Sequence, residues 1–134
     1  MMPQTKCTLL LLLIPLFLLV EIALGQSKVY VEVYNNLPPG STFAIQCKSR
    51  DDNLGVHILA PNQVYSFHFG LNVIGTTLYY CRLRSAYGQG VYDFYKNSRD
   101  YTRCTQVCTY KVTPVGVFAY SDGRRVPDFV FRWK

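Results

Sequence analysis

Groups that usually build catalytic and metal centres are scarce in this chain. It has two histidines, one tryptophan and eight acidic residues, of which only Glu21 and Glu32 are glutamates. No Asn-x-Ser/Thr sequon occurs, so N-glycosylation is not expected. No stretch has a helical hydrophobic period, and no apolar run beyond the N-terminal region is long enough to span a bilayer. These absences argue against an EF-hand, a zinc site and an integral membrane protein.

The first 25 residues have the pattern of a secretory signal peptide. Lys6 precedes an apolar run from Leu9 to Val20, and small residues follow at Ala23 and Gly25. The run is shorter than the ~20 residues that a membrane-spanning helix needs. We therefore expect a signal peptide over 1–25, a single mature domain over 26–134 and a secreted, extracellular product. An uncleaved N-terminal anchor is the alternative.

The cysteine count indicates disulfides. Cys7 lies in the predicted signal peptide, which leaves an even set of four: Cys47, Cys81, Cys104 and Cys108. An even set in a small exported domain is typical of two disulfides. A zinc site would need a second close pair of ligands, and a catalytic thiol would leave an odd cysteine. Of the three possible connectivities, we expect Cys47 with Cys108 and Cys81 with Cys104, in the core or between sheets.

Basic residues outnumber acidic ones in this chain, 14 against 8. The formal net charge is +6, and removing 1–25 leaves it unchanged because Lys6 and Glu21 are lost together. The basic residues are scattered, apart from Arg124 and Arg125. A cationic surface attracts anionic partners such as cell-wall acids, membranes or nucleic acid, although such charge also serves solubility alone.

Alternation of apolar and polar residues predicts a protein made of strands. Val29, Val31 and Val33 fall on one strand face, and similar period-two segments recur about every ten residues. Turn residues separate them, with Asp122-Gly123 a strong hairpin signal. The fold class that follows is all-β, a small disulfide-stabilised antiparallel β-sandwich. The expected strands are 28–34, 42–47, 54–59, 64–69, 78–83, 90–96, 106–112, 115–121 and 128–133.

The segment CKSRDDNLG at 47–55 is the most conspicuous candidate site. As a calcium loop it lacks alternating oxygen ligands and a following Glu at the twelfth position. As a glycosidase pair it fails because neighbouring side chains on extended backbone point to opposite faces. A turn closed by Asp and Asn side chains fits better, with exposed Asp51 and Asp52 free to contact a partner.

Histidines and aromatic residues suggest two further hypotheses. A basic secreted ribonuclease would use His57 and His68, but each sits alone in an expected strand without a recognisable catalytic spacing. Exposed tyrosines beside arginines favour a basic, aromatic binding face instead. The arginines concerned are Arg82, Arg84, Arg99 and Arg103.

The sequence resembles the plant self-incompatibility S1 family, also called S-protein homologues. The resemblance rests on CKSRDDNLG, the aromatic strand VYSFHF, TTLYYCRL and a C-x-x-x-C pair followed by an aromatic residue. It covers the chain from about Val29 to Trp133. Asn53 replaces a usual third aspartate, Tyr110 a usual tryptophan, and Val115-Gly116 a common Asp-Gly turn. The change at Asn53 weakens any charge-dependent role of that turn.

The resemblance implies a secreted β-sandwich without catalytic activity or cofactor. Members of the family act as ligands that a pollen membrane protein recognises, and others are secreted signals in reproduction, development or defence. We therefore expect a monomeric ligand for a plasma-membrane receptor or cell-surface protein, with weak binding to anionic cell-wall material, no nucleic-acid partner and no membrane insertion. Alternatives are a secreted hydrolase such as a ribonuclease, and a charge-driven binder of cell-wall polysaccharide. Expected partner-binding residues are Arg50, Asp51, Asp52, Asn53, Tyr87, Gln89, Arg99, Asp100, Tyr101 and Arg103.

Overall fold

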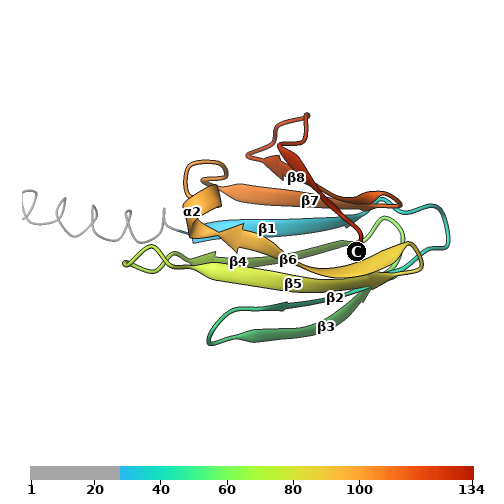
Figure 1. The fold of residues 1–134 in the computed structure, drawn as a ribbon, viewed down its shortest axis with the longest axis horizontal. Coiled ribbons are helices and arrows are strands. Elements are labelled where there is room, and N and C mark those ends of the chain that lie inside the picture. The colour runs from blue at the N-terminus through green and yellow to red at the C-terminus, as the bar shows by residue number, and fades with distance from the viewer. Residues whose placement is uncertain (1–27) are drawn as a thin grey trace, which may run out of the picture.

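Nine β-strands and one short helix make up residues 28–134, the part of the chain that the computed structural model describes (Figure 1). The predicted signal peptide lies outside the described residues. Each expected strand is found, with ends shifted by a few residues. The elements are β1 (Lys28–Asn35), β2 (Phe43–Lys48), β3 (Asn53–Leu59), β4 (Val64–Gly70), β5 (Leu78–Ser85), β6 (Gly88–Lys96), α2 (Asn97–Asp100), β7 (Val107–Thr113), β8 (Gly116–Ser121) and β9 (Phe129–Arg132).

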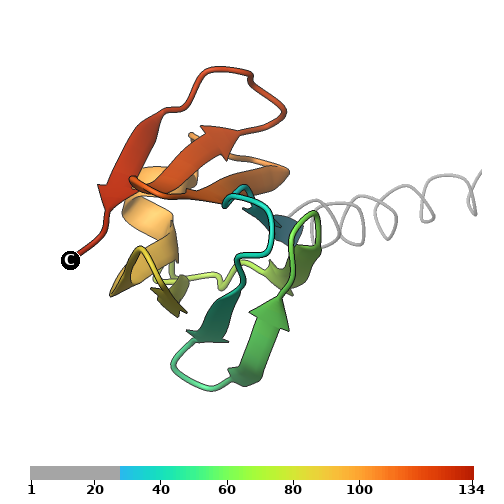
Figure 2. The same cartoon turned by 90° about the vertical axis from the view of Figure 1, so that its right-hand side faces the viewer.

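The strands form two sheets that face one another. One has the order β4-β1-β7-β8-β9 and the other β3-β2-β5-β6. Viewed along the strands, the sheet with β7 and β8 lies above the sheet with β2 and β3 (Figure 2). The all-β sandwich is therefore confirmed. Within 28–134, no helix is long and apolar enough to cross a membrane.

One strand pair departs from the antiparallel expectation. β1 pairs with β4 antiparallel but with β7 in parallel, so that Tyr30 lies opposite Val107. Alternation within a strand shows which residues are buried but says nothing of the direction of its neighbour. The turn predicted at Asp122-Gly123 is present between the antiparallel strands β8 and β9, and Gly123 has a φ of 76° in it. The pairing of β8 with β9 ends at Ala119 and Phe129, so this turn begins a longer loop and is not a two-residue hairpin.

The inner faces of both sheets bury the alternating residues that the sequence indicates. Val29, Val31 and Val33 of β1 are almost completely buried. Aromatic rings join the two sheets: Phe94 of β6 stacks on Tyr110 of β7, with ring centroids 4.0 Å apart. Burying large side chains of this kind contributes roughly 1.5–3 kcal/mol each, so the inter-sheet layer supplies most of the stabilisation.

The disulfide pairing predicted from sequence is wrong. The bridges are Cys47–Cys81 and Cys104–Cys108. Cys47 and Cys81 are register partners on the adjacent strands β2 and β5, with Cα atoms 4.0 Å apart. Cys108 lies on β7 of the other sheet, where the short segment before β7 brings Cys104 to it. All four are buried, as expected, but neither bridge crosses between the sheets.

The C-terminal strand closes the sandwich beside β6. Phe131 of β9 stacks on Tyr92 of β6, with centroids 5.0 Å apart. Trp133 donates its indole N–H to the carbonyl of Thr113 at 3.0 Å and lies so close to Gly88 that any Cβ there would collide with it. These contacts cover part of the otherwise free edge of the four-stranded sheet.

Candidate functional site

The β2–β3 turn is fixed by its own hydrogen bonds. Ser49 donates its N–H to the carbonyl of Asp52 at 2.8 Å, and the Ser49 hydroxyl accepts the N–H of Asp52 at 3.1 Å. Asn53 accepts the N–H of Gly55, which has a φ of 82°. The turn predicted for this segment is present, and it leaves the side chains of Arg50 and Asp51 exposed.

The β4–β5 loop, 71–77, lies at the same end of the sandwich and is equally well braced. The Asn72 side chain accepts the N–H of Thr76 at 2.8 Å and donates to the Thr76 hydroxyl at 3.0 Å. The Asn72 N–H donates to the hydroxyl of Thr77 at 2.9 Å. This frame presents two adjacent apolar residues at its tip: Val73 is 98% and Ile74 76% exposed. Loop tips are normally polar, so this exposed apolar pair is a candidate contact surface.

A cleft of about 630 Å³ separates the turn from the loop. Its walls combine the charges of Arg50, Asp51 and Asp52 with the apolar side chain of Ile74 and the Tyr79 ring. The Tyr79 hydroxyl donates to Asp52 at 3.4 Å, and burial is the main reason why its pKa is raised above 10.0. We call the β2–β3 turn, the 71–77 loop and this space the cleft end; it lies at the left of Figure 1, near α2.

The two histidines are not brought together. His57 of β3 donates its Nε2–H to the carbonyl of Leu54 at 2.9 Å, and its ring stacks on that of Tyr65 with centroids 4.4 Å apart. His68 of β4 belongs to the other sheet, and its ring centroid lies 5.2 Å from that of Tyr30. Neither lines the cleft. Within 28–134, no group of three or more His, Cys, Asp or Glu residues could hold a metal ion.

The predicted partner-binding residues are divided between the two ends of the sandwich. Ser85 pairs with Phe43, whereas Lys48 pairs with Tyr80, so the β5–β6 turn lies at the end away from the β2–β3 turn. Tyr87 and Gln89 are exposed there. The other predicted residues lie at the cleft end or next to it. Arg50 to Asn53 belong to the β2–β3 turn, and 99–103 lie in and after α2, where the Asn97 N–H donates to the Thr77 carbonyl of the 71–77 loop at 3.1 Å. Tyr101, at the end of α2, is 61% exposed and available to a partner.

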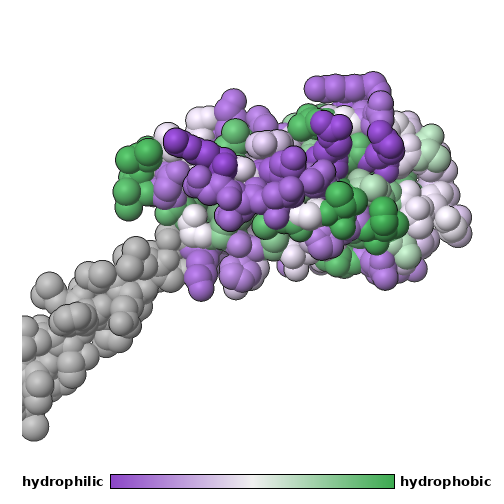
Figure 3. Space-filling model, turned by 90° about the horizontal axis from the view of Figure 1, so that it is seen from below, coloured by the Kyte–Doolittle hydropathy of each residue, from purple (hydrophilic) through white to green (hydrophobic). Residues whose placement is uncertain are grey.

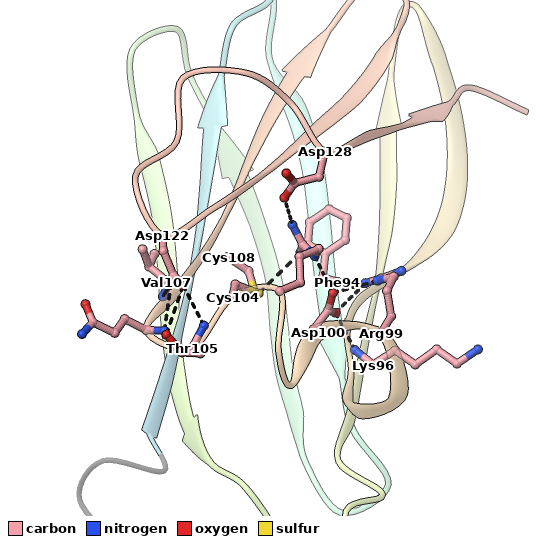
Figure 4. The surroundings of a disulfide bond; sticks show 12 residues. Phe94, Lys96, Arg99, Asp100, Cys104, Thr105, Val107, Cys108, Asp122 and Asp128 are labelled. Atoms are coloured by element: carbon pink, nitrogen blue, oxygen red, sulfur yellow. Dashed lines mark hydrogen bonds and ion pairs between the residues drawn. A yellow bond between two sulfur atoms is a disulfide. The ribbon is translucent and has the colours of Figure 1, made fainter.

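Asp100 is a structural residue, not a partner contact. Its carboxylate is completely buried and accepts hydrogen bonds from Arg99 at 2.7 and 2.8 Å, from Arg103 at 2.7 Å and from the Lys96 N–H at 2.9 Å (Figure 4). Arg103 continues the network to Asp128 at 2.7 Å. The sequence shows charged residues at 99, 100 and 103 but not that Asp100 faces inward, because a helix of four residues is too short for a hydrophobic period to be recognised.

The electrostatics of this network favour the ionised carboxylate. Burial alone would raise the pKa of Asp100, but the hydrogen bonds from Arg99, the Lys96 N–H and Arg103 outweigh it and lower that pKa below 3.8. Both guanidinium groups also lie over the Phe129 ring, at 4.7 and 4.8 Å from its centroid. The network therefore fixes α2 and β9 to one another.

The sequence did not point to the most exposed apolar residues of the cleft end, Val73 and Ile74. The stretch around them shows only a turn signal, Gly70-Leu71-Asn72, and an apolar pair next to it is easily assigned to the following strand. The usable signal was that the pair stands between Asn72 and Gly75, both turn residues, and so has no strand to belong to.

The fold and the cleft end define a class: a small, disulfide-bonded β-sandwich whose candidate binding surface is built from loops at one end. The profile of the plant self-incompatibility protein S1 family matches residues 30–133. The chain belongs to the plant self-incompatibility protein S1 family.

Relatives from Arabidopsis thaliana agree with this assignment. S-protein homolog 3 is 32% identical over 132 residues, which cover 88% of this chain and 87% of that protein. S-protein homolog 24 is 40% identical over 90 residues; these are 66% of this chain and 59%, less than two thirds, of that relative. A solved structure of SPH (self-incompatibility protein homologue) proteins, described as a widespread family of small, highly stable, secreted proteins from plants, matches 81% of this chain and 96% of its own with a TM-score of 0.65. At 18% identity that likeness concerns the fold alone.

Proposed function

We propose that this protein is a secreted, non-catalytic signalling ligand whose cleft end binds a plasma-membrane receptor or another cell-surface protein. The observation that carries the proposal is the braced 71–77 loop, which holds Val73 and Ile74 out in water beside the charged β2–β3 turn. Membership of the S1 family supports it, and so does the description of SPH proteins as secreted. The biological setting is recognition between plant cells, in reproduction, development or defence.

The energetics of the cleft end suit a protein partner. Burying a valine or isoleucine side chain contributes roughly 1.5–3 kcal/mol, so transfer of Val73 and Ile74 into a pocket supplies about 3–6 kcal/mol. Because hydrogen bonds already order the loop, little conformational entropy is lost when it binds. Arg50, Asp51 and Asp52 then act at the rim, where charges set partner choice and association rate more than affinity.

Binding of labelled protein to membrane fractions from pollen and other plant tissues tests the proposal. The protein is expressed from the full chain and measured at low and physiological salt, with unlabelled protein as competitor. We expect saturable, competed binding that survives physiological salt in at least one tissue. The double variant Val73→Ser/Ile74→Ser should bind about 100-fold more weakly, which corresponds to about 3 kcal/mol.

A matched control is available on β3. Val56 and Ile58 are each 63% exposed, but they lie on the outer face of the four-stranded sheet, and neither lines the cleft. Val56→Ser/Ile58→Ser changes the same kind of surface and should leave receptor binding within about twofold. Equal losses in both double variants, or full binding by Val73→Ser/Ile74→Ser with an unchanged melting temperature, would refute the cleft end as the binding surface.

A further inference from the structure

The outer face of the four-stranded sheet carries two arginines that the network around Asp100 does not use. Arg82 and Arg84 alternate with buried residues along β5, so both side chains project from the same face, about 7 Å apart along the strand. Both are exposed, and neither forms an ion pair within residues 28–134. Two unpaired guanidinium groups side by side repel one another, so this face has positive charge that no nearby carboxylate balances.

Strand register defines what surrounds this pair. Arg84 is flanked by Ala44 and Gln89, and Arg82 by Gln46 and Val91. Beyond β2, the next positions on β3 are Ile58 and Val56. These two rows thus contain amides and aliphatic side chains but no carboxylate. The acidic residue of the face is Asp93, one row further towards α2 and half-buried.

Two shallow grooves run along the arginine pair, one on each side. The first, about 340 Å³, lies towards β6 and includes Gln89, Val91 and Lys134 among its walls. The second, about 170 Å³, lies towards β2 and β3 and includes Gln46 and Val56. Arg82 and Arg84 line both, so they form a ridge between the grooves. Figure 3, seen from the β2 and β3 side, shows a band of hydrophilic side chains with hydrophobic patches next to it.

We propose that this face binds an acidic polysaccharide, a chain of uronic acid units, laid along β5. Planar guanidinium groups bind carboxylates through two parallel hydrogen bonds, which suits carboxylates that recur along a polymer. The amide of Gln89 is placed to bind sugar hydroxyls, and so is the amide oxygen of Gln46, whose NH2 group donates to Asn53 at 3.2 Å. Val56 and Val91 offer apolar surface to the C–H faces of the sugars. This face is separate from the cleft end, so the site does not depend on the proposed receptor binding.

The composition of the face favours a polysaccharide over a nucleic acid. Proteins that bind single strands on a sheet stack bases on exposed aromatic side chains. The rows of Arg82 and Arg84 contain no aromatic residue; Tyr80 is one row further on and half-buried. What is present is charge, amides and aliphatic surface, without the aromatic side chains that usually serve as stacking platforms for bases.

The test measures binding of the protein, expressed from the full chain, to polygalacturonate and to its fully methyl-esterified form, which lacks the charges. We expect wild-type binding to polygalacturonate only, weakening as salt screens the charges. Arg82→Gln/Arg84→Gln should weaken it about tenfold, equivalent to about 1.4 kcal/mol. Arg82→Lys/Arg84→Lys should fall in between, because lysine keeps the charge but not the paired geometry.

The chain provides a control of equal charge. Arg124 and Arg125 are adjacent and exposed on the β8–β9 loop, so Arg124→Gln/Arg125→Gln removes the same two charges elsewhere. It should weaken binding less than threefold, and Val73→Ser/Ile74→Ser should not change it. Equal losses from both arginine pairs would show attraction by net charge without a site. Single-stranded polyuridylate bound as tightly as polygalacturonate, and lost in the same variant, would also overturn the proposal.

The melting temperatures of all variants are measured first, since β5 is a central strand. Backbone amide shifts on titration with galacturonic acid oligomers give an independent readout of the wild-type protein. They should move on β2, β5 and β6 around Arg82 and Arg84. Shifts confined to the cleft end would refute the assignment.

Discussion

Replacing Asp100 by asparagine tests whether the α2 network is structural. The Asp100 side chain is fully buried, whereas those of Arg99 and Arg103 are 28% and 12% exposed. Asp100→Asn leaves two largely buried cations short of a counter-charge. Breaking a buried ion pair costs about 3–5 kcal/mol, and the lower end applies because Arg99 reaches solvent and Arg103 retains Asp128. We expect a loss of about 3 kcal/mol and a melting temperature lower by at least about 12 °C.

The effect should also depend on pH. Because the folded-state pKa of Asp100 lies below its ordinary value of 3.8, its contribution to stability is fully present above that value and is lost as pH falls through the folded-state pKa. The difference in unfolding free energy between wild type and Asp100→Asn should therefore be constant from pH 7 to about pH 5 and shrink below about pH 4. Urea unfolding at pH 7, 5 and 3 measures it.

The control for this experiment is Asp51→Asn, which removes the same charge from an exposed turn. It should change the melting temperature by no more than about 2 °C. If Asp100→Asn is as mild as Asp51→Asn, or if it abolishes receptor binding while the fold is unchanged, the structural assignment fails. Asp100 would then be a contact residue, as the sequence alone suggested.

Two further predictions concern the bridges and the C-terminal strand. Replacing both cysteines of Cys47–Cys81 by serine should lower the unfolding free energy by about 4 kcal/mol, and the same change at Cys104–Cys108 by about 2 kcal/mol. The difference arises because the first bridge closes a loop of 34 residues and the second a loop of 4. Denaturant titration of the two double variants measures both losses, and the reverse order would contradict the loop-entropy account. Gly88→Ala should lower the unfolding free energy by about 1–3 kcal/mol, because the new Cβ displaces Trp133. Gly70→Ala is the control: the space around Gly70 is open, so its unfolding free energy should change by less than about 0.5 kcal/mol. Equal melting temperatures for the two variants would show that Trp133 moves aside freely.

The sequence predicts the local features of this fold better than it predicts which strands and which cysteines pair. Period-two alternation along β1 and β5 identified the buried faces because burial acts on each strand separately. The direction of β1 against β7, and the choice of Cys81 rather than Cys108 as the partner of Cys47, depend on which strands become neighbours. That choice is made by the packing of the whole chain, which no local pattern contains.

The candidate site, too, could be predicted from the sequence only where local interactions determine it. The turn at 49–52 was predictable, because Asp and Asn side chains close it locally. The different roles of the arginines could not be predicted. Arg99 and Arg103 bind Asp100, whereas Arg82 and Arg84 form no ion pair within 28–134, yet in the sequence all four are cations in or beside expected strands. Their different roles follow from whether a buried carboxylate lies within reach.

The position of β1 has a consequence for the order in which the protein is completed during synthesis. β1 is the first strand of the sandwich, yet it lies inside its sheet, between β4 and β7. Its valine face can be partly covered once β4 has been made, but its parallel neighbour follows only at Val107–Thr113. The other sheet needs nothing beyond Lys96, and Cys47 can already be joined to Cys81 at that stage. A nascent chain thus holds one finished sheet against an unfinished one, and the last quarter of the sequence decides when the hydrophobic interior is sealed.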